Sequence, residues 1–134
     1  KNRTRMASLV PSVEKYLIDA TKGIIGLHAV HVADRDGLTI AKTSSDQKVN
    51  LSSLSSTFSS VSDQASKLNL GQNKTIITFL DKFVVVQTLS SPLVITFVGS
   101  ENLNVGAVKI CIPKVKKSLA GLREKVESII SSIQ

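Results

Sequence analysis

Apolar residues recur at helical spacing in the middle of the chain. Between residues 51 and 70 they are separated alternately by three and four positions, so they share one face of a helix. Asn50 is expected to cap the beginning of this helix and Gly71 to stop it. The apolar stripe consists of Leu51, Leu54, Phe58, Val61, Ala65 and Leu68.

One further helix is predicted near each end of the chain. Residues 11–22 carry apolar side chains three and four apart after Pro11, and residues 114–133 repeat that spacing. The stretch before the second of these, residues 105–112, fits either a sixth strand or a first helical segment that Pro113 kinks.

Five short segments rich in branched and aromatic residues are predicted to be strands. Gly37 supplies the positive φ that a hairpin turn requires between the first two. The last three are nearly continuous apolar runs, which is typical of strands covered on both faces. The segments are Leu27–Asp34, Leu38–Thr43, Lys74–Leu80, Phe83–Thr88 and Leu93–Gly99.

This order of elements predicts an α+β fold with three layers. A five-stranded antiparallel sheet carries the central helix on one face and the two terminal helices on the other. If the central helix crosses from one sheet edge to the opposite one, residues 74–80 form an edge strand beside it. An edge strand next to an apolar helix offers unpaired backbone groups and apolar surface to a partner.

The length of 134 residues fits a single domain, which we expect to span residues 6–134. Residues 1–5 precede Met6 and are expected to be an expression remnant or an upstream leader; without them the formal net charge falls from +7 to +4.

One cysteine cannot form an internal disulfide. No apolar run approaches the roughly 20 residues that cross a bilayer, so membrane association is expected only through partners.

No set of residues in the sequence predicts an active site, a cofactor site or a metal site. His28 and His31 lie three apart on a predicted strand, so they point to opposite faces, and we expect both to be half-exposed. Residues 34–37 begin like a calcium loop but lack its later carboxylate, which favours a plain turn. Cys111 lies in an apolar stretch and is expected to pack; a hydrolase using this thiol is the enzymatic alternative.

The densest basic cluster is formed by Lys114, Lys116 and Lys117, with Lys109 and Arg123 nearby. A solvated helix face explains the cluster, and docking of an acidic protein is the first functional alternative, followed by nucleic acid or anionic lipid. The 4% aromatic content provides no platform for stacked bases, which argues against nucleic acid.

Seven serines between residues 52 and 62 crowd the central helix. Small side chains let a second helix approach closely, which is the favoured interpretation, and phosphorylation is the other.

Several motifs together resemble the roadblock/dynein light chain family. Within that family, the block from Ser56 to Ile77 is similar to scaffold subunits of Ragulator, the late endosomal and lysosomal adaptor complex. The last helix departs from the pattern, because Pro113 and the lysines of residues 114–117 stand where the family tends to be acidic or neutral. The motifs are Gly26-Leu27-His28-Ala29, Asp34-Arg35-Asp36-Gly37, Ser56-Thr57-Phe58, Asp63-Gln64-Ala65-Ser66-Lys67-Leu68, Asn73-Lys74-Thr75-Ile76-Ile77, Val85-Val86-Gln87, Pro92-Leu93-Val94, Thr96-Phe97-Val98-Gly99, Asn104-Val105-Gly106 and Leu122-Arg123.

The resemblance implies a roadblock-like sandwich that acts as a non-catalytic signalling scaffold. Such a subunit pairs with a second roadblock subunit and is held by a lipidated Ragulator anchor subunit on the cytoplasmic face of late endosomes and lysosomes. There it supports signalling by a MAP kinase kinase and by Rag GTPases and mTOR. The implied pairing surface is Phe58, Val61, Gln64, Ala65 and Leu68 on the helix, with Thr75, Ile76, Ile77 and Thr78 on the strand.

A second possibility within the family is a roadblock homodimer that regulates a small GTPase directly. It differs from the scaffold in requiring self-association rather than a second kind of subunit.

Overall fold

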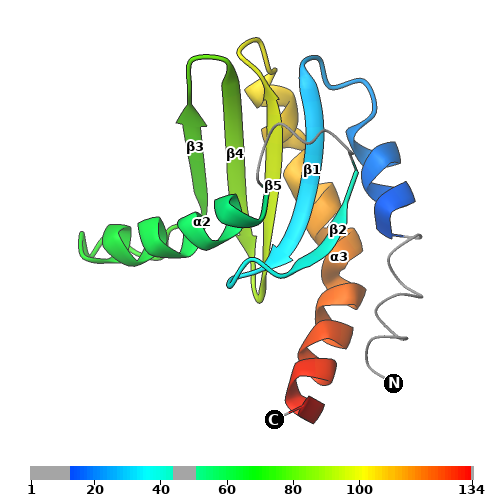
Figure 1. Cartoon of the computed structure of the whole chain (residues 1–134), viewed down its shortest axis with the longest axis vertical. Coiled ribbons are helices and arrows are strands. Elements are labelled where there is room, and N and C mark those ends of the chain that lie inside the picture. Colours follow the sequence, from blue (N-terminus) through cyan, green and yellow to red (C-terminus); the bar gives the residue numbers. More distant parts are fainter. Residues whose placement is uncertain (1–12, 44–50, 134) are drawn as a thin grey trace.

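The computed structural model describes residues 13–43 and 51–133, and its elements follow the predicted order (Figure 1). The expectations about residues 1–5, Pro11 and the Asn50 cap lie outside the described residues. After an N-terminal helix over residues 13–21, the elements are β1 (Leu27–Asp34), β2 (Thr39–Lys42), α2 (Leu51–Ser66), β3 (Thr75–Phe79), β4 (Phe83–Ser90), β5 (Leu93–Ser100) and α3 (Val105–Ile133).

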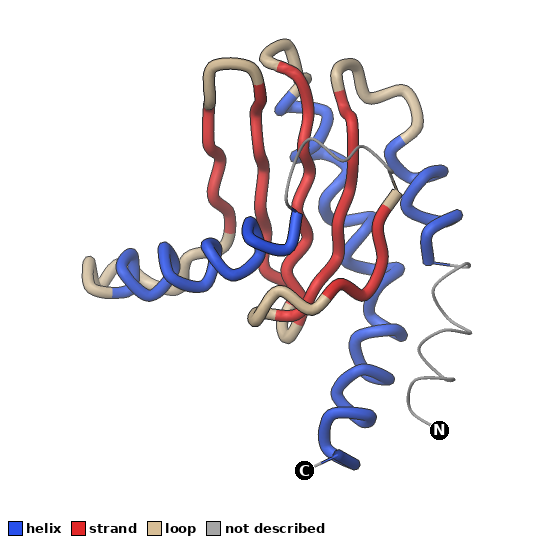
Figure 2. The backbone as a smooth tube through the Cα atoms, viewed as in Figure 1, coloured by secondary structure: helices blue, strands red, loops and turns tan. Residues whose placement is uncertain are grey.

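The five strands form one antiparallel sheet in the order β2-β1-β5-β4-β3, with β3 at one edge as predicted. In this order β1 pairs with β5, so Val30 lies opposite Phe97. Figure 2 shows α2 on one face of the sheet and α3 on the other. The N-terminal helix packs on the α3 face, where Leu17 joins the main core. The predicted three-layer α+β fold is therefore confirmed.

The main core fills the space between the sheet and the two helices on the α3 face. Alternate residues of the strands point into it, as the period of two along a strand requires. Full burial of such side chains stabilises the fold by roughly 1.5–3 kcal/mol each. The largest contributors from the strands and helices include Leu17, Val30, Val32, Val86, Ile95, Phe97, Val108, Val115 and Leu119.

The central helix is shorter than predicted, because α2 ends at Ser66 and not at Leu70. The Ser66 hydroxyl donates to the Asp63 carbonyl at 2.6 Å, and the amides of residues 67–69 bond three residues back. Asn69 then adopts a positive φ of 55°. The predicted stop at Gly71 was thus wrong, since a tightened turn and a left-handed asparagine end the helix earlier.

The ambiguous segment of residues 105–112 is helical and forms the first part of α3, which is one continuous helix from Val105 to Ile133. The Asn104 side-chain oxygen accepts the Ala107 amide at 3.0 Å, which caps the helix. Pro113 lies inside α3 and removes one backbone donor. The helix continues past it because Val108, Ile112 and Val115 keep one buried stripe against the sheet.

Two glycines allow the chain to cross itself where β1 begins and β5 ends. A side chain at Gly99 would meet the Gly26 carbonyl oxygen at 2.6 Å and the Leu103 Cβ at 2.9 Å. Gly26 itself has a φ of +85°, and a side chain there would meet the Leu103 Cα at 2.9 Å. The motif Gly26-Leu27-His28-Ala29, which resembles the roadblock family, therefore begins at a position where only glycine fits.

We expect Gly99→Ala to lower the free energy of unfolding by about 1–3 kcal/mol, because the obstructing atoms are mainly backbone and a packed leucine. Gly121→Ala is the matched control. A Cβ at Gly121 meets nothing within 4 Å, and alanine in a helix interior should stabilise by about 0.5–1 kcal/mol. Urea unfolding of both variants measures the difference, and equal effects would contradict the crossing described above.

Candidate partner-binding site

The outer edge of β3 is open. β3 pairs with β4 from Thr75↔Thr88 to Phe79↔Val84, and no strand lies along its other side among the described residues. Its outward N–H and C=O groups are therefore available to a strand from another chain. In the view of Figure 1, α2 reaches past β3, so a helix and a strand edge are presented together.

Large apolar side chains accompany this edge. Val61 is 42% exposed and Leu70 86% exposed near the end of α2, while Phe79 at the far end of β3 is 72% exposed. Leu68 and Leu80 are exposed as well. We call these five residues, together with the outer backbone edge of β3, the edge surface.

Most of the sequence-predicted pairing residues lie on or beside the edge surface. On the helix, Val61, Gln64 and Leu68 are exposed, and Ala65 is half-buried; Leu68 follows the end of α2. On the strand, Thr75, Ile76, Ile77 and Thr78 are all half-buried.

Phe58 is different, because its side chain is fully buried. It lies one helical turn from Leu54 and Ser55, which contact the sheet. Phe58 therefore anchors α2 to its own sheet and is not part of the exposed surface. A fully buried position also means that a charged substitution there would test folding and not pairing.

The residues missed by the sequence reasoning are Leu70, Phe79 and Leu80. The available signal was three large apolar residues next to predicted turns, where polar residues are usual. The sequence pattern places Phe79 and Leu80 in a predicted strand and Leu70 at the end of the predicted helix, outside its apolar stripe.

A small set of polar side chains fixes α2 on the sheet. The Gln87 side-chain N–H donates to the Leu54 carbonyl at 2.6 Å and also lies 3.4 Å from the Thr96 hydroxyl. The Ser55 hydroxyl lies 3.4 Å from His31 Nδ1. All four of these side chains, His31, Ser55, Gln87 and Thr96, are buried, and we call them the polar layer.

Hydroxyl groups along α2 form further contacts within the chain. Ser59 donates to the Arg35 carbonyl at 3.1 Å, and the Asn73 side chain donates to Ser62 at 2.9 Å. These contacts hold the middle of the helix and the loop before β3. Close approach of a second helix over the serines remains a prediction.

The expectation that both histidines are half-exposed was wrong for His31, and a register shift between Leu27 and Ala29 interrupts the strand alternation that was expected to place them on opposite faces. His28 is exposed, with its ring 6.4 Å from that of Phe83. His31 is only 1% exposed because it lies beneath α2, where its Nε2 is 3.0 Å from the Thr39 hydroxyl. Burial, together with repulsion from Lys42, lowers the pKa of His31 to about 4.

Cys111 packs as expected. Its thiol is buried and lies 3.4 Å from the Ala20 carbonyl on the N-terminal helix. Burial raises the pKa of the thiol, which opposes formation of a nucleophilic thiolate. The geometry therefore gives no support to a hydrolase based on this residue.

The Asp34–Gly37 segment is the predicted hairpin turn. The Asp34 carboxylate accepts the amides of Asp36 and Leu38, both at 2.9 Å, and Gly37 has a φ of 96°. Across residues 13–43 and 51–133, no group of three or more His, Cys, Asp or Glu side chains could hold a metal ion.

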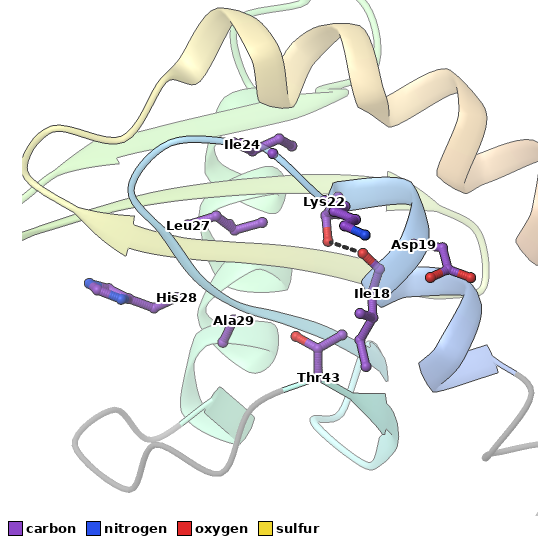
Figure 3. A pocket seen from close by; sticks show the side chains of 10 residues that line it. Ile18, Asp19, Lys22, Ile24, Leu27, His28, Ala29 and Thr43 are labelled. Carbon is purple, nitrogen blue, oxygen red and sulfur yellow. Dashed lines mark hydrogen bonds between the residues drawn. The ribbon is translucent and has the colours of Figure 1, made fainter.

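A hollow of about 370 Å³ lies between the N-terminal helix and the start of β1 (Figure 3). Asp19 and His28 lie at opposite ends of it. The Thr21 hydroxyl is already bonded to the Leu17 carbonyl at 2.7 Å, and the Thr43 hydroxyl accepts the Val30 amide at 2.9 Å. Polar groups do not converge in the hollow, so it offers no arrangement for acid–base chemistry.

The described helices include none that is both long enough and apolar enough to cross a membrane.

Solved structures place the fold in a known class. The chain superimposes on a Roadblock/LC7 domain from Streptomyces avermitilis with a TM-score of 0.65, covering 78% of this chain and 91% of that one. At 10% sequence identity this similarity defines the architecture alone. The chain thus has a roadblock/LC7 fold.

Sequence comparison then defines the family. The family described as mitogen-activated protein kinase kinase 1 interacting matches residues 11–133, and this chain belongs to it. The Ragulator complex protein LAMTOR3 homolog of Drosophila melanogaster is 37% identical over 117 residues, covering 85% of this chain and 94% of the relative. Ragulator complex protein LAMTOR3 of Pagrus major is 34% identical, covering 91% and 98%. The family takes its name from an interaction and not from a reaction, which agrees with the expectation that the chain is not an enzyme.

The buried position of His31 predicts a pH-dependent stability. Because the folded pKa of about 4 lies below the ordinary value of 6.5, the unfolded chain binds the proton more readily. The contribution of His31 to stability is fully present above pH 6.5. It is lost as the pH falls toward 4, by about 3 kcal/mol.

Urea unfolding at pH 7 and pH 4 should show this loss in the native chain and a smaller one in His31→Gln. His28→Gln is the matched control, since His28 is exposed on the same strand. If His31→Gln kept the full pH dependence of the native chain, other groups would be responsible.

Proposed function

We propose that this protein is a non-catalytic scaffold that forms a heterodimer with a second roadblock-domain subunit. The edge surface is the pairing site. An outer β3 edge joins the corresponding edge of the partner, and the exposed part of α2 packs against the partner's helix. This arrangement extends one sheet across two subunits.

The open β3 edge with its exposed apolar residues is the observation that carries the proposal. An unpaired edge strand offers backbone N–H and C=O groups with which a strand of another chain can pair. Exposed Val61, Leu70 and Phe79 add apolar area along the same edge. Their burial on pairing is favourable by roughly 25 cal/mol for each Å² removed from water.

Family membership supports the partners that we propose. The family is described as interacting with mitogen-activated protein kinase kinase 1, and the curated relatives are named as Ragulator complex proteins. We infer that a MAP kinase kinase and Rag GTPases are reached through the same assembly, which links the scaffold to MAP kinase and mTOR signalling.

We further propose that the protein acts on the cytoplasmic face of late endosomes and lysosomes. A lipidated anchor subunit of Ragulator would hold it there, so its contact with the membrane is indirect. Away from that assembly the protein would be cytoplasmic.

Val61→Asp should weaken heterodimer formation at least about a hundredfold while the chain stays folded. Val61 is exposed in the single chain, so the charge is tolerated there, whereas burying an unpaired carboxylate on pairing costs several kcal/mol. Leu38→Asp is the matched control, because Leu38 is an exposed apolar residue at the β1–β2 turn, away from β3.

The measurement is the mass in solution by light scattering, for the chain alone and mixed with a second roadblock-domain subunit. A 1:1 complex that Val61→Asp abolishes and Leu38→Asp preserves would support the proposal. A tight homodimer indifferent to the added subunit would favour direct regulation of a small GTPase. A heterodimer that survives Val61→Asp would place the pairing site elsewhere.

A further inference from the structure

The first part of α3 carries a positive charge that nothing nearby in the sequence balances. Residues 102–123 contain four lysines and one arginine but no acidic residue. The lysines are Lys109, Lys114, Lys116 and Lys117, and none of them forms an ion pair within residues 13–43 and 51–133. Their charges therefore do not contribute to holding the described fold together.

The geometry of α3 directs one lysine and one isoleucine straight outward. Val108 and Val115 are fully buried against the sheet. Ile110 and Lys117 each follow one of these valines by two residues, which is a rotation of about 200° around the helix, so both point away from the sheet. Ile110 is accordingly 73% exposed, and Lys117 is exposed as well.

The other three lysines lie on the two flanks of this outward direction. Lys109 and Lys116 are seven residues apart, about two helical turns, and share one flank. Lys114 lies on the opposite flank, beside the N-terminal helix, whose Tyr16 hydroxyl donates to the Lys114 carbonyl at 3.3 Å. Lys109 and Lys114 are exposed, and Lys116 is half-buried. We call the four lysines and Ile110 the outer lysine face.

The outer lysine face is unfavourable for the free chain and complementary to an anionic ligand. Lys114 and Lys117 are three residues apart, so they are neighbours on the helix surface, and like charges at this spacing destabilise a helix. Around Ile110 the surface also has little relief. A Cβ at Gly106 would meet the Asn104 side-chain oxygen only at the ordinary contact distance of 3.5 Å, so a second helix can approach closely here.

We propose that the outer lysine face binds an acidic amphipathic helix of a protein partner. Carboxylates on the two flanks of that helix contact Lys109 and Lys116 on one side and Lys114 on the other, and an apolar side chain between them covers Ile110. Because α3 and α2 lie on opposite faces of the sheet (Figure 2), this site shares no residue with the edge surface and does not depend on heterodimer formation.

The spacing of the charges favours a helical protein segment over a lipid bilayer. Lys109 and Lys116 repeat after seven residues, and Lys114 and Lys117 after three, which are the intervals at which a neighbouring helix presents side chains from one face. Lipid headgroups diffuse independently and require no such interval. The face also exposes a single large apolar side chain, Ile110, whereas helices that lie in a membrane interface insert a broad apolar face.

The test measures the fluorescence anisotropy of a labelled helical peptide of about 20 residues, made of Ala, Leu and Glu, as the full chain is added. Its leucines form one stripe, and its glutamates flank the stripe. The double variant Lys109→Gln/Lys114→Gln should bind this peptide about five- to twentyfold more weakly than the native chain. The matched control is Lys67→Gln/Lys82→Gln, which removes the same charge from exposed lysines outside α3 and should stay within about twofold.

Further measurements separate the site from folding and from pairing. Ile110→Ser should weaken binding by about three- to tenfold through the lost apolar contact. Lys109→Gln/Lys114→Gln should leave the thermal midpoint of the free chain unchanged, because both lysines are exposed. Val61→Asp should bind the peptide normally, so a failure of the proposed heterodimer would not be mistaken for a failure of this site.

Four results would overturn the proposal. Equal weakening by the control variant would mean that only net charge matters. Equal affinity for a peptide with Gln in place of Glu would mean that charge is not recognised, and equal affinity for a scrambled acidic peptide would mean that helical spacing is not. Binding to vesicles containing about 30% phosphatidylserine, without peptide binding, would assign the outer lysine face to a membrane contact.

Discussion

The seating of α2 on the sheet is the constraint on which the edge surface depends. Phe58 supplies apolar burial, and the polar layer supplies direction, because its hydrogen bonds have preferred partners and angles. A purely apolar contact would let the helix slide or rotate at little cost. With Gln87 bonded to the Leu54 carbonyl at one end and Asn73 to Ser62 further along, α2 is held so that Val61 stays exposed beside β3. The shape of the edge surface therefore follows from contacts that lie beneath it.

The polar layer also explains an apparent weakness in the sequence of α2. Serine is a poor helix former, because its hydroxyl competes for backbone bonds. In this protein Ser55 meets His31 and Ser59 meets the Arg35 carbonyl, so side chains that lower intrinsic helix propensity contribute to tertiary contacts instead. These tertiary contacts stabilise α2 even though the intrinsic helix propensity of its sequence is low.

Much of the architecture could be predicted because apolar periodicity reports burial directly. The bounds of β1 were reproduced, and β3 lies at the sheet edge, as expected if the helix before it crosses from one edge of the sheet to the other. The early end of α2 was missed, because it depends on a serine back-bond and a left-handed Asn69. The burial of His31 was missed because it also depends on tertiary packing. The spacing of two histidines on a strand does not reveal that a helix will cover one of them.

The residues of the candidate pairing site divide in the same way, into those that apolar periodicity can assign and those that depend on tertiary packing. Val61 and Leu68 could be assigned from the helical stripe and the family resemblance, and they are exposed as that assignment requires. Phe58 belongs to the same stripe, yet the side of the stripe that faces the sheet is decided by helix rotation, which spacing alone does not fix.

The place of β1 beside β5 has a consequence for the order of events during synthesis. Val30 finds its partner Phe97 only after 67 further residues have been made. The first hairpin therefore leaves the ribosome with one long edge uncovered, and the sheet closes only when the fifth strand inserts between β1 and β4. Such distant pairing raises contact order and slows folding. The nascent chain is thus exposed to association through its interior strands before its functional edge exists, which makes this topology dependent on timely completion of the chain.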